Sequence, residues 1–117
     1  YQITSPNGKI IGAFQGEKPV GFVNVQYIAG ELTVNNIAVM PEYRGQGLGG
    51  RLLEYAFEAY PETEVALLEV RKSNIPAQKL YKKYGFEKVG ERKNYYSNPT
   101  EDAILMTKKM GDGNELY

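Results

Sequence analysis

Hydrophobic positions in the first third of the chain fall into three short runs separated by turns that contain glycine. The runs are Lys9–Gln15, Val20–Ile28 and Leu32–Met40. Within the second run, the residues from Phe22 to Val25 alternate in the manner of a strand. Because the links between the runs are short, we expect three strands in an antiparallel meander.

The hydrophobic period changes after the third run. An apolar stripe with helical spacing is formed by Leu48, Leu52, Tyr55 and Ala59. Proline cannot continue a helix. The pattern therefore predicts one helix that begins at Leu48 and ends before Pro61.

The remainder of the chain predicts three more strands and a second helix. The strands are Val65–Arg71, Phe86–Arg92 and Asp102–Lys108, and residues 94–101 join the last two. The helix is marked by an apolar stripe made of Ala77, Leu80, Tyr81 and Tyr84. Asn74 suits its N-cap, and Gly85 suits the left-handed residue that closes it.

The element order βββαβαββ predicts an α/β protein with a mixed, mostly antiparallel sheet flanked by helices. A chain of 117 residues has the size of one domain. We expect that domain to occupy residues 1–110, with a polar tail over residues 111–117.

Charge and hydropathy argue against two classes of partner. Fourteen basic residues balance fourteen acidic ones, so no net field draws the chain to nucleic acid or to an anionic membrane. No apolar run approaches the roughly 18 residues that a membrane helix needs. We therefore expect neither a nucleic-acid partner nor a membrane partner, and the sequence leaves the oligomeric state open.

The absence of two residue types narrows the chemistry further. The sequence contains no cysteine and no histidine. This excludes a thiolate nucleophile, a Ser-His-Asp triad and a zinc site built on histidine or cysteine. Acid–base chemistry must come from Glu, Asp, Tyr or Lys, and we expect no metal.

A glycine-rich segment lies between the third predicted strand and the first predicted helix. It reads Arg44-Gly45-Gln46-Gly47-Leu48-Gly49-Gly50. Glycines let a ligand approach the backbone, and the first N–H groups of a helix lack intrahelical partners and favour an anion. Arg44 adds a charge suited to phosphate oxygens. These features predict a cradle for a pyrophosphate, with a purely structural turn as the alternative.

Two common phosphate-binding motifs fit this segment poorly. Gly45, Gly47 and Gly50 satisfy G-x-G-x-x-G, but four residues separate the strand from the first glycine. Gly45 and Gly50 have the spacing of a P-loop, but Arg51-Leu52 stands where Lys-Ser/Thr is required. Dinucleotide and nucleoside-triphosphate sites are therefore disfavoured.

The segment Asn36-Ile37-Ala38-Val39, followed by Arg44-x-x-Gly47-x-Gly49, resembles the acetyl-CoA signature of the Gcn5-related N-acetyltransferase (GNAT) family. Later segments extend the resemblance in order: Leu68-Glu69-Val70-Arg71, Ser73-Asn74, Leu80-Tyr81, Tyr84-Gly85-Phe86 and Arg92-Lys93-Asn94-Tyr95-Tyr96. These later segments are similar to the bacterial ribosomal-protein-alanine N-acetyltransferase branch.

The resemblance implies a cytoplasmic enzyme that moves the acetyl group of acetyl-CoA to a primary amine. The acceptor that it favours is the N-terminal α-amine of a protein, in this branch a ribosomal protein. Without a cysteine to carry an acyl group, direct attack in a ternary complex is the economical mechanism. Lysine side chains, polyamines and other small amines stay open as acceptors.

Members of this family usually begin with a strand and one or two helices that help to wall the acceptor site. This chain opens at what resembles their second strand, so these elements are expected to be absent. A non-catalytic CoA-binding module and a nucleotide-binding regulator are therefore alternatives from other functional classes.

The resemblance also implies a set of cofactor-binding residues. They are Ile37, Ala38, Val39, Arg44, Gly45, Gln46, Gly47, Leu48, Gly49, Gly50 and Asn74. The strand from Ile37 to Val39 would offer backbone groups, one of which could polarise the thioester carbonyl. Asn74 fits equally a helix cap and a hydrogen bond to the pantetheine arm.

Glu69 is the candidate general base. It lies on an apolar strand, on the same face as Leu67 and Arg71. Partial desolvation raises the pKa of a carboxylate toward the range of a general base. The strand alone favours an exposed side chain paired with Arg71, and the resemblance favours the base.

Tyr81 is the candidate acid for the departing thiolate. Its position on an apolar stripe favours core packing, and the resemblance favours the acid. Tyr95 and Tyr96 are candidates for the acceptor pocket, with packing inside the last hairpin as an equal alternative.

Overall fold

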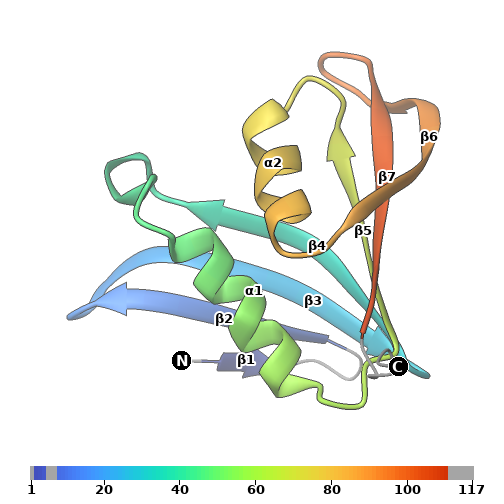
Figure 1. Cartoon of the computed structure of the whole chain (residues 1–117). Helices are drawn as coiled ribbons and strands as arrows, with labels where there is room; N and C mark the ends of the chain where they lie inside the picture. The colour runs from blue at the N-terminus through green and yellow to red at the C-terminus, as the bar shows by residue number, and fades with distance from the viewer. Residues whose placement is uncertain (1, 5–7, 111–117) are drawn as a thin grey trace.

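A computed structural model of the chain describes residues 2–4 and 8–110 as a twisted seven-stranded sheet with two helices and one short 3-10 turn (Figure 1). The strands are β1 (Gln2–Thr4), β2 (Gly8–Gln15), β3 (Lys18–Ile28), β4 (Glu31–Val39), β5 (Val65–Arg71), β6 (Glu87–Tyr96) and β7 (Glu101–Lys109). The helices are α1 (Leu48–Ala59) and α2 (Ile75–Lys83), and the 3-10 turn is Pro41–Tyr43.

The sheet is mixed and mostly antiparallel, as the sequence predicts. Its strand order is β1-β2-β3-β4-β5-β7-β6. The meander β2-β3-β4 is antiparallel, and β4 and β5 are parallel because α1 carries the chain back across the sheet. The fold class is therefore confirmed.

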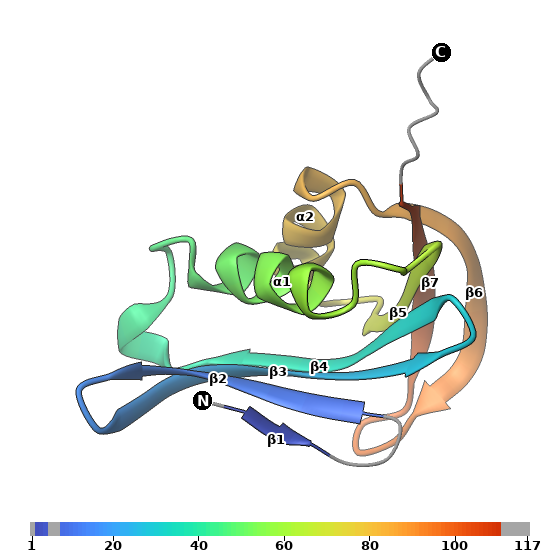
Figure 2. The same cartoon turned by 90° about the horizontal axis from the view of Figure 1, so that it is seen from below.

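Both helices cover the same face of the sheet (Figure 2). Helix α1 crosses β2, β3 and β4 and packs its apolar stripe on them. Leu52 and Leu53 are fully buried there, and each contributes about 1.5–3 kcal/mol by leaving water. The core under the two helices includes Val23, Val25, Leu32, Ala66, Leu68, Tyr81, Phe86 and Met106.

Strands β4 and β5 separate at the point where the functional residues begin. Their pairing runs only from Glu31 opposite Val65 to Val34 opposite Leu68. Asn24 of β3 pairs with Asn36, but its neighbour Val25 pairs with Val34, so β4 contains one extra residue at Asn35. Such a bulge bends a strand. A gap between β4 and β5 therefore opens beyond Val34 and Leu68.

Several element boundaries differ from the predicted ones. Strand β1 and the turn Pro41–Tyr43 were not predicted, and β4 ends at Val39, one residue before Met40. Strand β6 continues to Tyr96, so the prediction that residues 94–101 join the last two strands was wrong. The register shifts between Arg92 and Tyr96, and the strands pair again at Tyr96 opposite Glu101. Within the shifted segment, Asn94 has a φ of 51° and donates its N–H to the Asp102 carboxylate across the hairpin. The predicted tail over 111–117 lies outside the described residues.

Candidate functional site

The glycine-rich loop leads from β4 into α1 and presents open backbone N–H groups. Gly45 and Gly47 have φ angles of 80° and 82°, and no atom lies within 4 Å of where their Cβ would be. Within the described part of the chain, the N–H groups of Gly47, Leu48 and Gly49 have no acceptor, and no side chain caps α1. This is the geometry that an anion needs at a helix start.

The two later glycines of the loop serve a different purpose. A Cβ on Gly49 would lie 3.1 Å from Leu80 Cδ2, and one on Gly50 would lie 2.0 Å from Tyr84 Oη. The first turn of α1 therefore packs directly on α2. Gly49 and Gly50 set the distance between the helices, whereas Gly45 and Gly47 leave room above the loop.

Arg44 and Gln46 hold the loop to the rest of the structure. The Arg44 Nε donates to the Val39 carbonyl at 2.9 Å, and the Gln46 amide reaches the Glu42 carbonyl at 3.5 Å. Only one guanidinium nitrogen of Arg44 is used in this way, and the side chain is exposed. Among the residues that the structure describes, the remaining donors of Arg44 have no acceptor, so they can bind a phosphate beside the open N–H groups.

The backbone of β4 faces the gap at alternate residues. Met40 donates its N–H to Val20 of β3 at 2.9 Å. Since backbone groups of a strand alternate in direction, Val39 and Ile37 direct theirs away from β3, toward the gap. Ala38 directs its own groups at β3. Of the three predicted residues, Ile37 and Val39 are therefore placed to offer backbone groups to a ligand in the gap.

Glu69 lies on the face of β5 opposite the helices, beside the gap. Its side chain is 28% exposed, and Arg92 Nη2 approaches Glu69 Oε2 at 3.3 Å. A hydrogen bond from Tyr95 to Glu69 raises the pKa of Tyr95. Glu69 is thus not the carboxylate among apolar neighbours that the strand suggests, because two polar side chains from β6 contact it.

Arg71 does not pair with Glu69, which corrects the alternative considered from the sequence. Its guanidinium donates to the carbonyls of Pro99 and Ser97 at 3.1 and 3.2 Å and to Glu101 Oε1 at 3.2 Å. It also lies 4.5 Å from the centre of the Tyr96 ring. Arg71 therefore clamps the tip of the β6–β7 hairpin to the end of β5, a role that sequence reasoning missed.

Tyr81 is buried with 9% exposure on the helix-covered face and packs edge-on to Phe86, with ring centres 5.8 Å apart. Burial raises its pKa, and the nearby Tyr96 adds to that rise. Its hydroxyl makes no hydrogen bond in the described part of the chain. Among the described residues, every side-chain oxygen that is fully buried has a hydrogen-bond partner. Because the Tyr81 hydroxyl has none, its oxygen is in contact with solvent.

Tyr96 interacts electrostatically with both candidate catalytic residues, Glu69 and Tyr81. Burial raises the pKa of Tyr96 most, and the charge of Glu69 raises it further. Tyr96 in turn adds to the raised pKa of Tyr81. Tyr95 and Tyr96 pack edge-on at 5.1 Å and line a hollow of about 420 Å³ together with Glu69 and Arg92. Both predicted functions of the tyrosines, hairpin packing and pocket wall, are thus compatible with their placement.

Asn74 caps α2. Its Oδ1 accepts the N–H of Ala77 at 3.2 Å, which fits the predicted N-cap. The amide nitrogen of Asn74 has no partner within the part of the chain that the structure covers, so the cap leaves a donor available at the start of α2.

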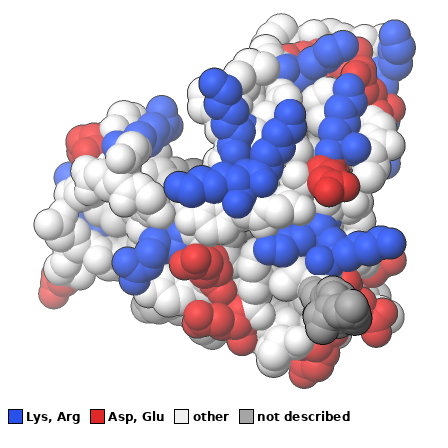
Figure 3. Space-filling view, viewed as in Figure 1, with Lys and Arg blue, Asp and Glu red and all other residues white. Residues whose placement is uncertain are grey.

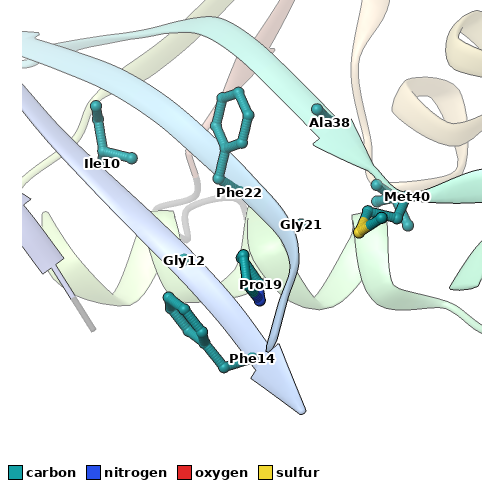
Figure 4. A pocket seen from close by; sticks show the side chains of 9 residues that line it. Ile10, Gly12, Phe14, Pro19, Gly21, Phe22, Ala38 and Met40 are labelled. Atoms are coloured by element: carbon teal, nitrogen blue, oxygen red, sulfur yellow. The ribbon is translucent and has the colours of Figure 1, made fainter. Parts of the chain in front are cut away.

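A second hollow, of about 530 Å³, crosses β2, β3 and β4 on the face away from the helices (Figure 4). It is lined by apolar side chains and glycines, among them Ile10, Phe14, Phe22 and Met40. Such a surface offers no side-chain donor to a phosphate. A phosphorylated ligand therefore fits the loop before α1 and not this groove.

Two further properties bear on the chemistry. Among residues 2–4 and 8–110, no group of acidic side chains is arranged to hold a metal ion. None of the described helices has the length and hydropathy of a membrane span.

The chain is similar in sequence and in fold to several acetyltransferases. A ribosomal protein bS18-alanine N-acetyltransferase of Escherichia coli (strain K12) is 43% identical over 96 residues, which are 79% of this chain and 65% of that protein. The crystal structure of the ribosomal-protein-S18-alanine N-acetyltransferase from Escherichia coli matches with a TM-score of 0.82 at 36% identity, covering 97% of this chain and 77% of that one.

A GNAT family acetyltransferase from Elizabethkingia anophelis, crystallised with acetyl-CoA bound, matches with a TM-score of 0.76 at 25% identity, covering 89% of this chain and 77% of that one. A relative from Bacillus subtilis (strain 168) is 46% identical over 88 residues, and this chain spans 58% of its length. The model described as the acetyltransferase (GNAT) family matches residues 1–86. The chain belongs to the GNAT acetyltransferase family.

Proposed function

We propose that the chain binds acetyl-CoA and transfers the acetyl group to a primary amine, with the N-terminal α-amine of a protein as the favoured acceptor. One observation carries the proposal: the open N–H groups at the start of α1 lie at the end of β4 that borders the gap next to β5. Membership of the GNAT family supports it.

The cofactor side of the site combines the loop with the edge of β4. The N–H groups of Gly47, Leu48 and Gly49, with Arg44, would hold the diphosphate of acetyl-CoA. The bound thioester supplies an electrophilic carbonyl carbon and a sulfur leaving group. A backbone N–H of Ile37 or Val39, directed into the gap, would donate to the thioester oxygen and polarise the carbonyl.

The acceptor side is the hollow beside Glu69. The carboxylate of Glu69 is oriented by Arg92 and Tyr95, and Tyr95 and Tyr96 form a wall beside it. Glu69 takes a proton from the incoming ammonium, directly or through a water, so that a neutral amine attacks the carbonyl carbon. This placement lets the acceptor approach from the face opposite the helices.

Tyr81 completes the transfer from the helix-covered face. A C–N bond forms, the C–S bond breaks, the Tyr81 hydroxyl gives its proton to the departing sulfur, and the attacking nitrogen releases its second proton to solvent. The raised pKa of Tyr81 keeps this hydroxyl protonated at neutral pH. Solvent returns a proton to Tyr81 and removes one from Glu69, which restores both groups.

The choice of acceptor rests on the relatives. The Escherichia coli protein that resembles this chain is named for acetylating an alanine of ribosomal protein bS18. We therefore place the N-terminal α-amine of a ribosomal protein first, which implies a cytoplasmic site of action. Lysine side chains and small amines are outcomes that the test must separate.

The direct test incubates the chain with acetyl-CoA and a peptide that has an N-terminal alanine and one lysine. We expect the mass of one acetyl group on the peptide, and fragmentation should place it on the α-amine. A matched peptide with a blocked N-terminus and a free lysine should not react.

The variants Glu69→Gln and Tyr81→Phe should bind acetyl-CoA normally but transfer slowly. Binding of acetyl-CoA with no transfer to any amine would favour the non-catalytic CoA-binding module. Modification of the blocked peptide at lysine would move the acceptor to lysine side chains.

A further inference from the structure

The hollow beside Glu69 contains neutral polar side chains that the proposed mechanism does not use. They are Thr33, Asn35 and Thr107, and they line the hollow of about 420 Å³ together with Glu69 and Arg92. Their side chains form no hydrogen bond with any described residue. The two hydroxyls and the amide are therefore available to a ligand that enters the hollow.

Of these three residues, Asn35 is the one that lies across from Glu69. The parallel pairing of β4 with β5 ends where Val34 lies opposite Leu68, and Asn35 and Glu69 are the next residues of the two strands. Asn35 is also the extra residue of the bulge, so β4 bends at this point. The gap between the strands therefore begins with Asn35 on one side and Glu69 on the other, and both residues line the same hollow.

The two threonines are farther from the amine that Glu69 would hold. Thr33 and Thr107 lie on either side of Leu67, in one row across β4, β5 and β7. Leu67 precedes Glu69 by two residues on β5, so this row is displaced from Glu69 along the strand by roughly 6–7 Å. The amide of Asn35 is therefore the neutral polar group best placed to contact an acceptor beside Glu69.

Charge alone does not select an acceptor in this hollow. The charged residues that line it are Glu69 and Arg92, one acidic and one basic. Basic side chains gather instead on the helix-covered face, over the region where Figure 1 places α2 and the start of α1 (Figure 3). Glu69 attracts every ammonium alike, whether it belongs to an N-terminus, a lysine or a polyamine. The choice among primary amines therefore depends on the neutral groups.

We infer that Asn35 makes the site selective for α-amines by donating a hydrogen bond from its side-chain amide to the carbonyl of the acceptor's first residue. This inference rests on the proposed function and assigns a residue that sets its acceptor class. In an N-terminal residue the carbonyl carbon lies two bonds from the amine nitrogen, whereas a lysine ε-amine or a polyamine has a methylene group there. An asparagine amide has two N–H donors. A site that hydrogen-bonds one group of its substrate rejects analogues that lack the group, because its own polar groups then stay unpaired.

The test compares two acceptors in steady-state kinetics with acetyl-CoA. One is a peptide with an N-terminal alanine, and the other is isopropylamine, which keeps the amine and has a methyl group in place of the carbonyl. Asn35→Leu keeps a side chain of similar size without a donor, and Asn35→Ala removes the amide without adding bulk. In both variants the KM for the peptide should rise about three- to tenfold with little change in kcat, as expected for one uncharged hydrogen bond to a group that does not react. Both variants should acetylate isopropylamine as the wild-type chain does.

The matched control is Asn24→Leu. Asn24 lies on β3 between Val23 and Val25, which are fully buried under the helices. Its side chain is therefore on the same face of the sheet as the hollow, but Asn24 is not among the described residues that line it. This variant should keep the wild-type KM for the peptide. Calorimetry should show that all three variants bind coenzyme A with wild-type affinity, which verifies the fold and the cofactor site.

Several results would overturn the inference and leave the proposed function intact. They are an unchanged KM in both Asn35 variants, a fall in kcat without a rise in KM, an equal loss with both acceptors, the same loss in Asn24→Leu, and weaker binding of coenzyme A by both Asn35 variants. The split between KM and kcat with the peptide decides the question even if isopropylamine reacts too slowly to measure. If the wild-type chain acetylates no amine, the proposed function falls together with the inference.

Discussion

Removal of the Arg71 guanidinium should release the tip of the β6–β7 hairpin without unfolding the protein. Arg71 donates to the carbonyls of Ser97 and Pro99 and lies over the Tyr96 ring. With its side chain about one third exposed, each hydrogen bond contributes about 0.5–1 kcal/mol and the ring contact about 0.5–1 kcal/mol. The sum is about 2 kcal/mol, or roughly a 30-fold rise in the population of the open hairpin.

Amide hydrogen exchange measures this opening directly. The N–H of Ser73 is bonded to Glu101, and the N–H of Asn94 is bonded to Asp102. In Arg71→Ala the protection of both amides should fall by up to about 30-fold. The amide of Met40, bonded to Val20 in a distant part of the sheet, should keep its protection. Arg71→Lys should restore little, because an ammonium cannot span two carbonyls and a carboxylate in the same geometry.

The functional readout follows from the place of the hairpin. Tyr96 lines the hollow beside Glu69, so Arg71→Ala should raise the KM for the acceptor and leave the affinity for coenzyme A unchanged. Arg92→Ala, which removes the ion pair with Glu69 and keeps the clamp, is the matched control for exchange. Unchanged protection at Ser73 and Asn94, or an equal loss at Met40, would refute this reasoning.

Four further predictions test other parts of the structure. Tyr81→Phe should lower kcat by about 10²–10³-fold with little change in coenzyme A affinity. Because burial raises the pKa of Tyr81, the kcat of the wild-type chain should not fall through ionisation of Tyr81 below pH 10. Steady-state kinetics measured across pH would contradict this if kcat fell at a lower pH. Gly47→Ala forces a residue with a side chain into a φ of 82°, at a cost of about 1–2 kcal/mol, and calorimetry should show weaker coenzyme A binding, whereas intact affinity would remove the loop from the site. Gly50→Ala places a Cβ 2.0 Å from Tyr84 Oη, so chemical denaturation should show a loss of about 1–3 kcal/mol in the free energy of unfolding. The double variant Gly50→Ala/Tyr84→Leu should recover part of this loss. Additive effects of the two changes would contradict direct packing. Hydrogen bonds from the Ser73 hydroxyl and N–H lower the pKa of Glu101. The stabilisation of the hairpin by Glu101 is therefore complete above the unfolded pKa of about 4.5 and is lost as pH falls through the lower folded value. The protection factor of the Ser73 amide, which is its exchange rate relative to the intrinsic rate at the same pH, should show this loss below pH 4.5 in wild type and not in Glu101→Gln.

Local patterns predict the elements well because each depends on nearby residues. The stripe beginning at Leu48 predicts the start of α1, and Asn74 predicts the N-cap of α2. The boundary of β6 could not be predicted in this way. Its extension to Tyr96 rests on pairing with Glu101 of the partner strand β7, and the Asn94 N–H also donates to Asp102 of that strand.

The candidate site also has a part that the sequence predicts and a part that it does not. The loop from Arg44 to Gly50 is recognisable because glycine, charge and helix start are adjacent in the sequence. The ion-pair partners of Glu69 and Arg71 cannot be recognised in this way. Arg92 pairs with Glu69 and Glu101 pairs with Arg71, and each pair is separated by more than twenty residues in the sequence. From the sequence alone, the four loop glycines cannot be distinguished. The position of α2 in the structure shows that Gly50 leaves space for Tyr84. Pairings across the sheet therefore require the folded structure.

We propose that coenzyme A binds with its diphosphate on the N–H groups at the start of α1. A titration of the isotopically labelled chain with coenzyme A, followed by amide chemical shifts, tests this claim most directly. We expect the largest shifts at Gly47, Leu48 and Gly49, with smaller ones at Ile37 and Val39. Largest shifts in the apolar groove, at Ile10 and Phe14, with an unperturbed loop would contradict it.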